Sequence, residues 1–228
     1  MRNKWIRRKR NSLGFGVQSP SDFYFVQHVL REQLPYYAYA EIHRMAKQNS
    51  TEGADYPEEI IRLLFRLTNH IHPQTIIEVG TGLGLSACAM AMARPMGECI
   101  TIEESSLLTP HPSPLTPHRK YPQITTKKGD EMALFSQTLT EKGAVELLHV
   151  AHTSHYREVV SMALPHVKDN TLFVIEGIHE SEDKRAWWKK LQEVHQQVII
   201  YDLESVGLLL FSRSRYRNKY WVSLRELK

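Results

Sequence analysis

The chain has 228 residues, of which 42% are hydrophobic and 24% are charged, and this is the composition of an ordinary globular protein. Its length fits one large domain with a small appendage, which can bury enough surface to fold without disulfides or structural metals. No stretch approaches the roughly 18 apolar residues of a membrane span. The two cysteines, Cys88 and Cys99, indicate a reducing compartment rather than a disulfide framework.

The formal charge of +4 is concentrated at the start of the chain. Six of the first ten residues are basic, namely Arg2, Lys4, Arg7, Arg8, Lys9 and Arg10. The remainder of the chain is therefore slightly acidic. We interpret residues 1–12 as a basic, flexible tail, with contact to RNA or anionic lipid as the alternative. The segment Asn11–Gly16 lacks the apolar core of a secretory signal, so we expect a cytoplasmic protein without a membrane span.

A helical N-terminal extension, or lid, is expected over residues 13–56, ahead of the main domain at 57–228. Its helical pattern from Ser21 to about Met45 is interrupted by LPYYAY (Leu34–Tyr39). The segment Pro57–His70 then carries an apolar stripe with helical spacing. Proline at the start, followed by two glutamates, suits the N-terminus of a helix.

Strands and helices alternate along the rest of the chain. The expected strands are Thr75–Val79, Cys99–Glu103, Ile124–Lys127, Val145–Val150, Leu172–Glu176, Val198–Tyr201 and Gly207–Ser212. The expected helices are Leu83–Ala93, Glu131–Glu141, His155–His166 and Asp183–Gln196. This alternation predicts an α/β protein with a Rossmann-like, seven-stranded, mostly parallel sheet and helices on both faces. The last two strands must form an antiparallel hairpin, because their connection is too short for a parallel crossover.

Two connections stand out within this pattern. The segment Leu107–Pro122 contains five prolines, so we expect a long exposed loop in place of a helix. The turn after the first strand reads EVGTGLG (Glu78–Gly84) and has glycines at alternate positions, Gly80, Gly82 and Gly84. Such a turn lets the backbone run close beneath a ligand, although a plain strand-to-helix turn is the alternative.

The residues around this turn narrow the choice of ligand. A dinucleotide fingerprint needs a glycine at position 85, where Leu85 stands, and no lysine follows to form a phosphate-binding loop. Glu103 ends the next strand, where a carboxylate can accept hydrogen bonds from a ribose diol. Two acids close to one turn, Glu78 and Glu103, would repel a pyrophosphate and favour a ligand with a positive centre, such as a sulfonium.

Together with TIE (Thr101–Glu103) and GD (Gly129–Asp130), the glycine turn resembles the class I S-adenosylmethionine-dependent methyltransferases. The resemblance runs from about Pro57 to the C-terminus and is greatest to the small-molecule O-methyltransferase-like subgroup. The segment Gly14–Leu30 also resembles uncharacterised bacterial members of that group.

The resemblance implies S-adenosylmethionine as the cofactor and assigns residues to it. These are Glu78, Gly80, Thr81, Gly82, Gly84, Glu103, Gly129 and Asp130. Glu78 would help to fix the turn, Glu103 would bind the ribose hydroxyls, and Asp130 would lie near the adenine amine. Asp130 also suits the N-cap of the helix that follows it, and both roles are compatible.

The methyl acceptor should bind beyond the carboxyl ends of two neighbouring strands. AHTSHY (Ala151–Tyr156) follows one of them and GIHES (Gly177–Ser181) the other. We expect His152 or His179 to act as the general base, with Glu176 as its orienter. Each histidine could instead be an ordinary polar loop residue.

Tyr36 and Tyr37 are expected to form part of an aromatic wall over the substrate. Ordinary packing between the N-terminal segment and the body is the alternative for these rings.

The chain departs from the catechol-type relatives at their magnesium site. Those relatives have an aspartate after the first of the two strands and an Asp-Asn pair near the second, where this chain has Ala151, Glu176 and Gly177. One carboxylate is too few for a hard cation, so we expect no metal. His149, His152 and His155 have an H-x2-H-x2-H spacing, but it matches no closed zinc site.

The favoured function is therefore metal-independent O-methylation of a small molecule. Because Ala151 and Gly177 replace acidic residues of the relatives, one alternative is a non-catalytic cofactor-binding or interaction protein. The basic N-terminus makes an RNA methyltransferase another alternative. Nucleic acid is a disfavoured partner, because the body lacks a basic patch flanked by aromatic residues. The identity of the acceptor, the choice between oxygen and nitrogen, and a homodimer all stay open.

Overall fold

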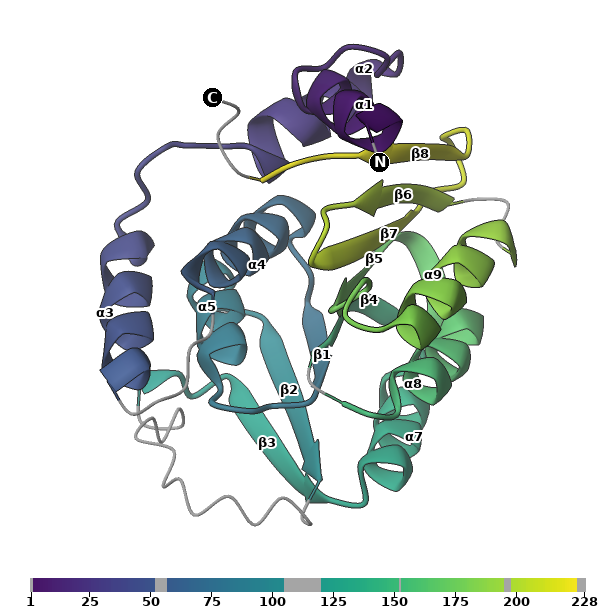
Figure 1. Ribbon diagram of the computed structural model, residues 1–228. Coiled ribbons are helices and arrows are strands. Elements are labelled where there is room, and N and C mark those ends of the chain that lie inside the picture. Colours follow the sequence, from purple (N-terminus) through teal and green to yellow (C-terminus); the bar gives the residue numbers. More distant parts are fainter. Residues whose placement is uncertain (1, 52–56, 105–119, 152, 195–197, 225–228) are drawn as a thin grey trace.

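The computed structural model describes residues 2–51, 57–104, 120–151, 153–194 and 198–224. Within these ranges the chain forms one eight-stranded sheet with helices packed on both faces (Figure 1). Most of the proline-rich segment Leu107–Pro122 lies outside the described residues. None of the described helices is both long enough and apolar enough to cross a bilayer.

The sheet has the order β3-β2-β1-β4-β5-β7-β6-β8. The strands are β1 (Thr75–Val79), β2 (Glu98–Glu104), β3 (Ile124–Gly129), β4 (Val145–Val150), β5 (Val167–Glu176), β6 (Val198–Asp202), β7 (Val206–Phe211) and β8 (Asn218–Trp221). Strands β1 to β5 are parallel, and β7 runs antiparallel to both β5 and β6, as the hairpin prediction requires. The order reverses between β1 and β4, and ligands of open α/β sheets bind at such a switch point.

The expectation of seven strands was one too few. The additional strand is β8, which pairs in parallel with β6 and forms the edge of the sheet. Its sequence, NKYW, is only four residues long and has no continuous apolar run, so its local pattern does not indicate a strand.

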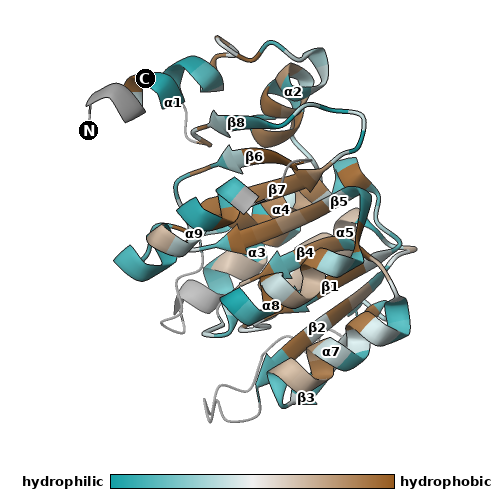
Figure 2. Ribbon diagram, turned by 90° about the vertical axis from the view of Figure 1, so that its right-hand side faces the viewer, coloured by the Kyte–Doolittle hydropathy of each residue, from teal (hydrophilic) through white to brown (hydrophobic). Residues whose placement is uncertain are grey.

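The sheet separates two layers of helices. α3 (Ala38–Thr51), α4 (Glu58–Ile71) and α5 (Leu85–Ala93) cover one face, while α7 (Glu131–Lys142), α8 (Tyr156–Ala163) and α9 (Glu182–Val194) cover the other. Successive strand residues contribute to opposite layers: Ile76 packs with the first helices and Ile77 with the second. Because both faces of the sheet are buried at its centre, central strands such as β5 and β7 are largely apolar and brown in Figure 2, whereas the edge strands β3 and β8 are polar.

The basic N-terminus is folded, which differs from the flexible tail expected over residues 1–12. Arg2–Ser12 form helix α1, which lies against β8. Arg8 Nη1 donates to the carbonyl oxygens of Asp202 and Val222 at 2.6 and 2.7 Å, and Arg8 Nη2 lies 2.8 Å from Asp202 Oδ1. A guanidinium with five donors can satisfy several acceptors at once, and here it fixes the helix to the sheet.

Asp22 provides a second attachment of the N-terminal extension. It lies in α2 (Pro20–Phe25), which continues into a π-helix at Val26–Leu30, and it is 1% exposed. Its carboxylate accepts hydrogen bonds from the hydroxyls of Tyr220 and Tyr201 at 2.8 and 3.3 Å, and it forms an ion pair with Arg215. The extension and the last strands of the sheet therefore stabilise one another.

Removing the charge of Asp22 should destabilise the protein. We expect Asp22→Asn to lower the free energy of unfolding by about 3 kcal/mol, because it leaves the largely buried Arg215 without its carboxylate. The matched control is Asp183→Asn, which breaks a solvent-exposed pair with Arg157 and should cost less than about 1 kcal/mol. Urea denaturation measures both; equal losses in the two variants would contradict this role.

Candidate functional site

The glycine turn between β1 and α5 has the backbone that the sequence predicts. Gly80, Gly82 and Gly84 have φ angles of +92°, +50° and +72°, a region that residues with a side chain rarely adopt. The amide of Gly80 donates to the carbonyl of Ile102 at 2.9 Å, which ties the turn to β2. A Cβ built on Gly82 would meet nothing within 4 Å, so the space beside this glycine is open to a ligand.

Glu78 is the centre of a buried network beneath this turn. Its side chain is fully buried, and its Oε2 accepts a hydrogen bond from Thr101 Oγ1 at 2.6 Å. Ser86 donates to the other carboxylate oxygen, and the hydroxyls of Thr81 and Thr101 are 2.6 Å apart. Glu78 thus joins β1, β2 and α5, and holds the turn from below.

His149 connects this network to the next part of the site. Its Nδ1 lies 2.9 Å from Glu78 Oε1, and its Nε2 lies 2.8 Å from Glu176 Oε1. The side chain is fully buried. Burial opposes protonation of the ring, but hydrogen bonds to Glu176 and Glu78 outweigh it and raise the pKa of His149 to about 9. The group is an imidazolium between two carboxylates at neutral pH.

Sequence reasoning missed this role of His149, which it weighed only as a metal ligand. β4 lies between β1 and β5, and His149 is directly opposite Glu78 in the register, which local patterns do not reveal. The available signal was a histidine within a mainly apolar strand, together with one glutamate in each of β1 and β5.

The remaining residues assigned to the cofactor lie along the carboxyl ends of β2 and β3. The side chain of Glu103 is 20% exposed, and Lys128 Nζ lies 3.2 Å from its Oε2. Gly129 ends β3, and Asp130 Oδ1 accepts a hydrogen bond from the amide of Ala133 at 2.7 Å. Asp130 is therefore the N-cap of α7, and it is exposed on the surface.

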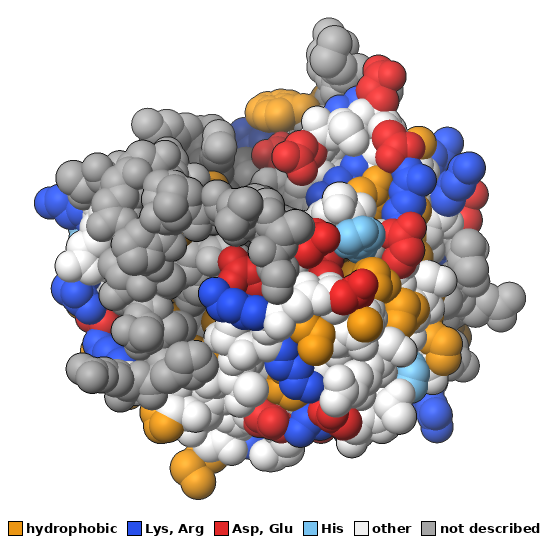
Figure 3. Space-filling model, turned by 90° about the horizontal axis from the view of Figure 1, so that it is seen from below, with side chains coloured by type: hydrophobic (Ala, Val, Ile, Leu, Met, Phe, Trp, Pro, Cys, Tyr) orange, Lys and Arg blue, Asp and Glu red, His pale blue; other side chains and the backbone are white. Residues whose placement is uncertain are grey.

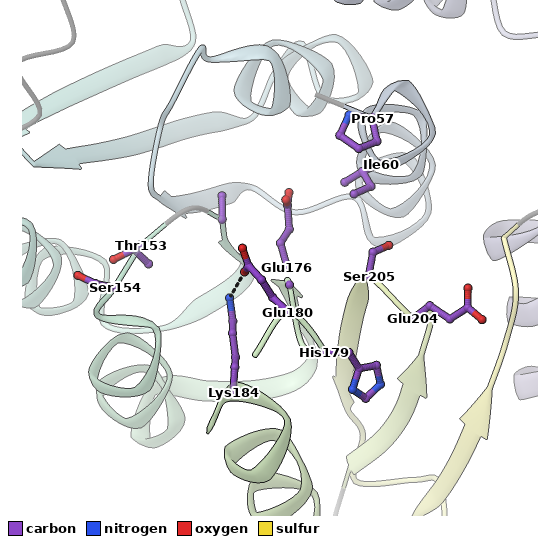
Figure 4. A pocket seen from close by; sticks show the side chains of 12 residues that line it. Pro57, Ile60, Thr153, Ser154, Glu176, His179, Glu180, Lys184, Glu204 and Ser205 are labelled. Carbon is purple, nitrogen blue, oxygen red and sulfur yellow. Dashed lines mark ion pairs between the residues drawn. The ribbon is translucent and has the colours of Figure 1, made fainter. Parts of the chain in front are cut away.

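A cavity of about 680 Å³ lies where β4 and β5 end (Figure 4). It is lined by Pro57, Ile60, Ala151, Thr153, Ser154, Glu176, Gly177, His179, Glu180, Lys184, Glu204 and Ser205. Two of the predicted catalytic residues, Glu176 and His179, are among them. The third, His152, lies outside the described residues. Seen from below, acidic side chains surround a histidine on this side of the molecule (Figure 3).

Glu176 contacts His149 on the neighbouring strand, and its side chain is 6% exposed. The expectation that Glu176 orients His152 or His179 stays a prediction, because His152 lies outside the described residues. His179 Nε2 lies 2.9 Å from Asp202 Oδ2, while its Nδ1 is buried with no hydrogen-bond partner in the described part of the chain. Burial would raise the pKa of Asp202, but His179 and Arg8 lower it to about 2, so Asp202 is ionised.

Lys184 is a cavity residue that the sequence did not single out. Its side chain is 10% exposed, and its ammonium lies 3.7 Å from Glu180 Oε2, the pair joined by the dashed line in Figure 4. It also lies 4.9 Å from the centre of the Tyr156 ring. The lining of the cavity therefore includes the carboxylates of Glu176 and Glu180 and the ammonium group of Lys184.

The structure does not bring Tyr36 and Tyr37 to this cavity. The Tyr36 ring packs against Tyr39 and Phe65 at centroid distances of 5.4 and 5.1 Å, and its hydroxyl donates to Glu32 at 2.7 Å. Tyr37 is 97% exposed. The alternative for Tyr36, packing between the extension and the body, is what the structure shows.

Of the three positions compared with the magnesium site of the catechol-type relatives, Ala151, Glu176 and Gly177, only Glu176 carries a carboxylate. Ala151 and Gly177 offer no side-chain oxygen at the two positions next to Glu176 in the cavity. His149 is committed to two glutamates, and His155 Nδ1 lies 3.0 Å from Glu131. Among the described residues, no group of three or more His, Cys, Asp or Glu side chains is arranged to hold a metal.

The raised pKa of His149 predicts how stability depends on pH. A proton bound more tightly in the folded state stabilises the fold fully below about pH 6.5, and this contribution is lost as the pH rises through about 9. We expect the free energy of unfolding to fall over that interval, in parallel with deprotonation of His149 followed by NMR. A neutral His149 ring at pH 7.5 would contradict the imidazolium.

No family model and no curated protein matches the sequence. Solved structures match the fold closely, at low identity. An O-methyltransferase from Bacillus cereus in complex with SAH has 15% identity and a TM-score of 0.61, over 82% of this chain and 96% of that one. The O-methyltransferase TomG from Streptomyces achromogenes, in complex with SAM, has 17% identity and a TM-score of 0.58, over 84% and 96%.

A methyltransferase from Geobacter sulfurreducens has 13% identity and a TM-score of 0.57, over 79% of this chain and 91% of that one. These likenesses span nearly the whole length of the solved chains. The protein therefore has the Rossmann-like α/β fold of the class I methyltransferases.

Proposed function

We propose that this protein is an S-adenosylmethionine-dependent methyltransferase that methylates a hydroxyl oxygen of a small molecule without a metal ion. The observation that carries the proposal is the buried chain Glu78–His149–Glu176, which joins the glycine turn to the cavity. The fold supports it, because solved proteins of this fold bind SAM or SAH. S-adenosylmethionine would supply an electrophilic methyl group on a sulfonium.

The residues of the turn fit such a cofactor. The positive φ angles of the three glycines and the open space beside Gly82 let a ligand approach the backbone. Thr81 and Glu78 hold the turn in this shape from within the sheet. Glu103 would accept hydrogen bonds from the ribose hydroxyls, and the exposed Asp130 would lie near the adenine amine.

Glu176 would act on the acceptor. Its carboxylate lies in the wall of the cavity, and His149 fixes its position from the protein side. A base held in place can remove the proton of an acceptor hydroxyl as the oxygen attacks the methyl group. Lys184 in the same cavity would favour an oxygen that gains negative charge. His179 could replace Glu176 as base only through Nδ1, because its Nε2 contacts Asp202.

A second candidate function rests on the same cavity. Ala151 and Gly177 stand where metal-dependent relatives would have acidic ligands, so the chain could bind the cofactor without catalysing transfer. Cofactor binding with no methyl transfer to a broad panel of acceptors would favour this second candidate. Of the basic N-terminus, Arg8 bonds to the sheet and is not available to an RNA substrate.

Calorimetry tests the proposal that the protein binds S-adenosylmethionine. We expect micromolar binding of S-adenosylmethionine by calorimetry, weakened at least about tenfold in Glu103→Gln because charge-assisted hydrogen bonds to the ribose are lost. The control is Glu98→Gln, at the opposite end of β2, where the side chain pairs with Lys142. Absence of heat and of a thermal shift in the unaltered protein would refute the proposal.

The rate of methyl transfer tests the proposed role of Glu176 as the general base. Glu176→Gln should lower the rate of transfer by about 10²- to 10⁴-fold, the usual contribution of a general base, and leave cofactor affinity nearly unchanged. Glu180→Gln is the control, since Glu180 lines the same cavity but its side chain is 69% exposed. If Glu176→Gln keeps the full rate and His179→Gln does not, the base is His179.

A further inference from the structure

A second cavity, of about 520 Å³, lies between α1 and β8 and is lined by three cationic side chains. Arg7 and Arg10 come from α1, and Lys219 comes from β8. Figure 1 shows the two elements side by side at one edge of the molecule. No carboxylate is among the described residues that line this cavity.

Two of the three cations, Arg7 and Lys219, contact the ring of Trp221. Arg7 Cζ lies 4.0 Å from the centre of the Trp221 ring, and Lys219 Nζ lies 5.0 Å from it. Cation–π contacts of this kind restrict both side chains and keep them near each other in spite of their repulsion. Burial lowers the pKa of Lys219, and the charges of Arg7 and Arg217 lower it further, whereas Asp202 and Glu193 act in the opposite direction.

The arginines of α1 differ in whether they form ion pairs with carboxylates. Arg8 pairs with Asp202 and Glu204. In the described part of the chain, by contrast, neither Arg7 nor Arg10 forms an ion pair with a carboxylate. Three neutral polar side chains of the cavity already have partners: Asn11 accepts from Trp221 N, while Tyr220 and Asn218 donate to Asp22. Arg7 and Arg10 therefore present to the cavity charges that have no carboxylate partner among the described residues.

We propose that the cavity between α1 and β8 binds the phosphate group of an anionic ligand. Arginine forks match the oxygens of a phosphate bidentately, and a lysine adds a point charge. Ile6 and Phe15 line the same cavity and are 41% and 61% exposed, so they suit an apolar part of the ligand next to its phosphate. The site is separate from the methyl-transfer site and does not depend on it.

Two sources present this chemistry, a soluble phosphorylated molecule and a phospholipid headgroup. Exposed apolar side chains next to the cavity, including Trp5 and Leu13, would contact lipid if the second source applies. The shared requirement is a phosphate held by Arg10 and Lys219.

The first arm titrates the full-length protein with inorganic phosphate at low ionic strength, followed by tryptophan fluorescence and calorimetry. We expect saturable binding that weakens at least about tenfold in Arg10→Gln and in Lys219→Gln, since each removes a charge-assisted contact. The matched control is Lys190→Gln, which removes an exposed cation of α9 outside the cavity. Thermal melts confirm that each variant is folded.

The second arm measures sedimentation with phosphatidylcholine vesicles, with and without phosphatidic acid. Binding to inorganic phosphate that depends on Arg10 and Lys219 supports a soluble ligand. Binding confined to vesicles with phosphatidic acid, with the same dependence, supports a headgroup. Binding in neither arm, or binding that the two variants leave unchanged, overturns the proposal.

Discussion

The charged imidazole of His149 between two carboxylates is the interaction on which the candidate site depends. A single buried charge is unfavourable, but an imidazolium with a carboxylate on each ring nitrogen satisfies all its donors. The arrangement is directional, because each ring nitrogen has one partner. It links Glu78 under the glycine turn to Glu176 in the cavity wall through one side chain.

Much of this fold could be predicted from local patterns, and what could not depends on contacts between distant residues. The strands β1 to β7 and the glycine turn follow from apolar runs and glycine spacing. Strand β8 is not encoded locally: its Tyr220 and Asn218 reach Asp22 in the N-terminal extension. Helix α1 looks like a solvated tail until Arg8 is placed against Asp202 and Val222.

The same distinction applies to the site. Residues that act through the backbone, such as Gly80 and Gly82, were predictable, because their φ angles are a local property. The partner of each side chain was not, since it requires the order of the strands. Glu176 was expected to orient His152 or His179, and its contact with His149, one strand away, was not foreseen. The position of Tyr36 likewise depends on tertiary packing, because its ring contacts Tyr39 and Phe65, which belong to two different helices.

The position of the positive charge has a consequence for the acceptor. In this chain the imidazolium lies behind Glu176, on the protein side of the carboxylate. It therefore fixes the Glu176 carboxylate but does not itself line the cavity. Lys184 lines the same cavity, so an oxygen that carries negative charge there would be stabilised by its ammonium.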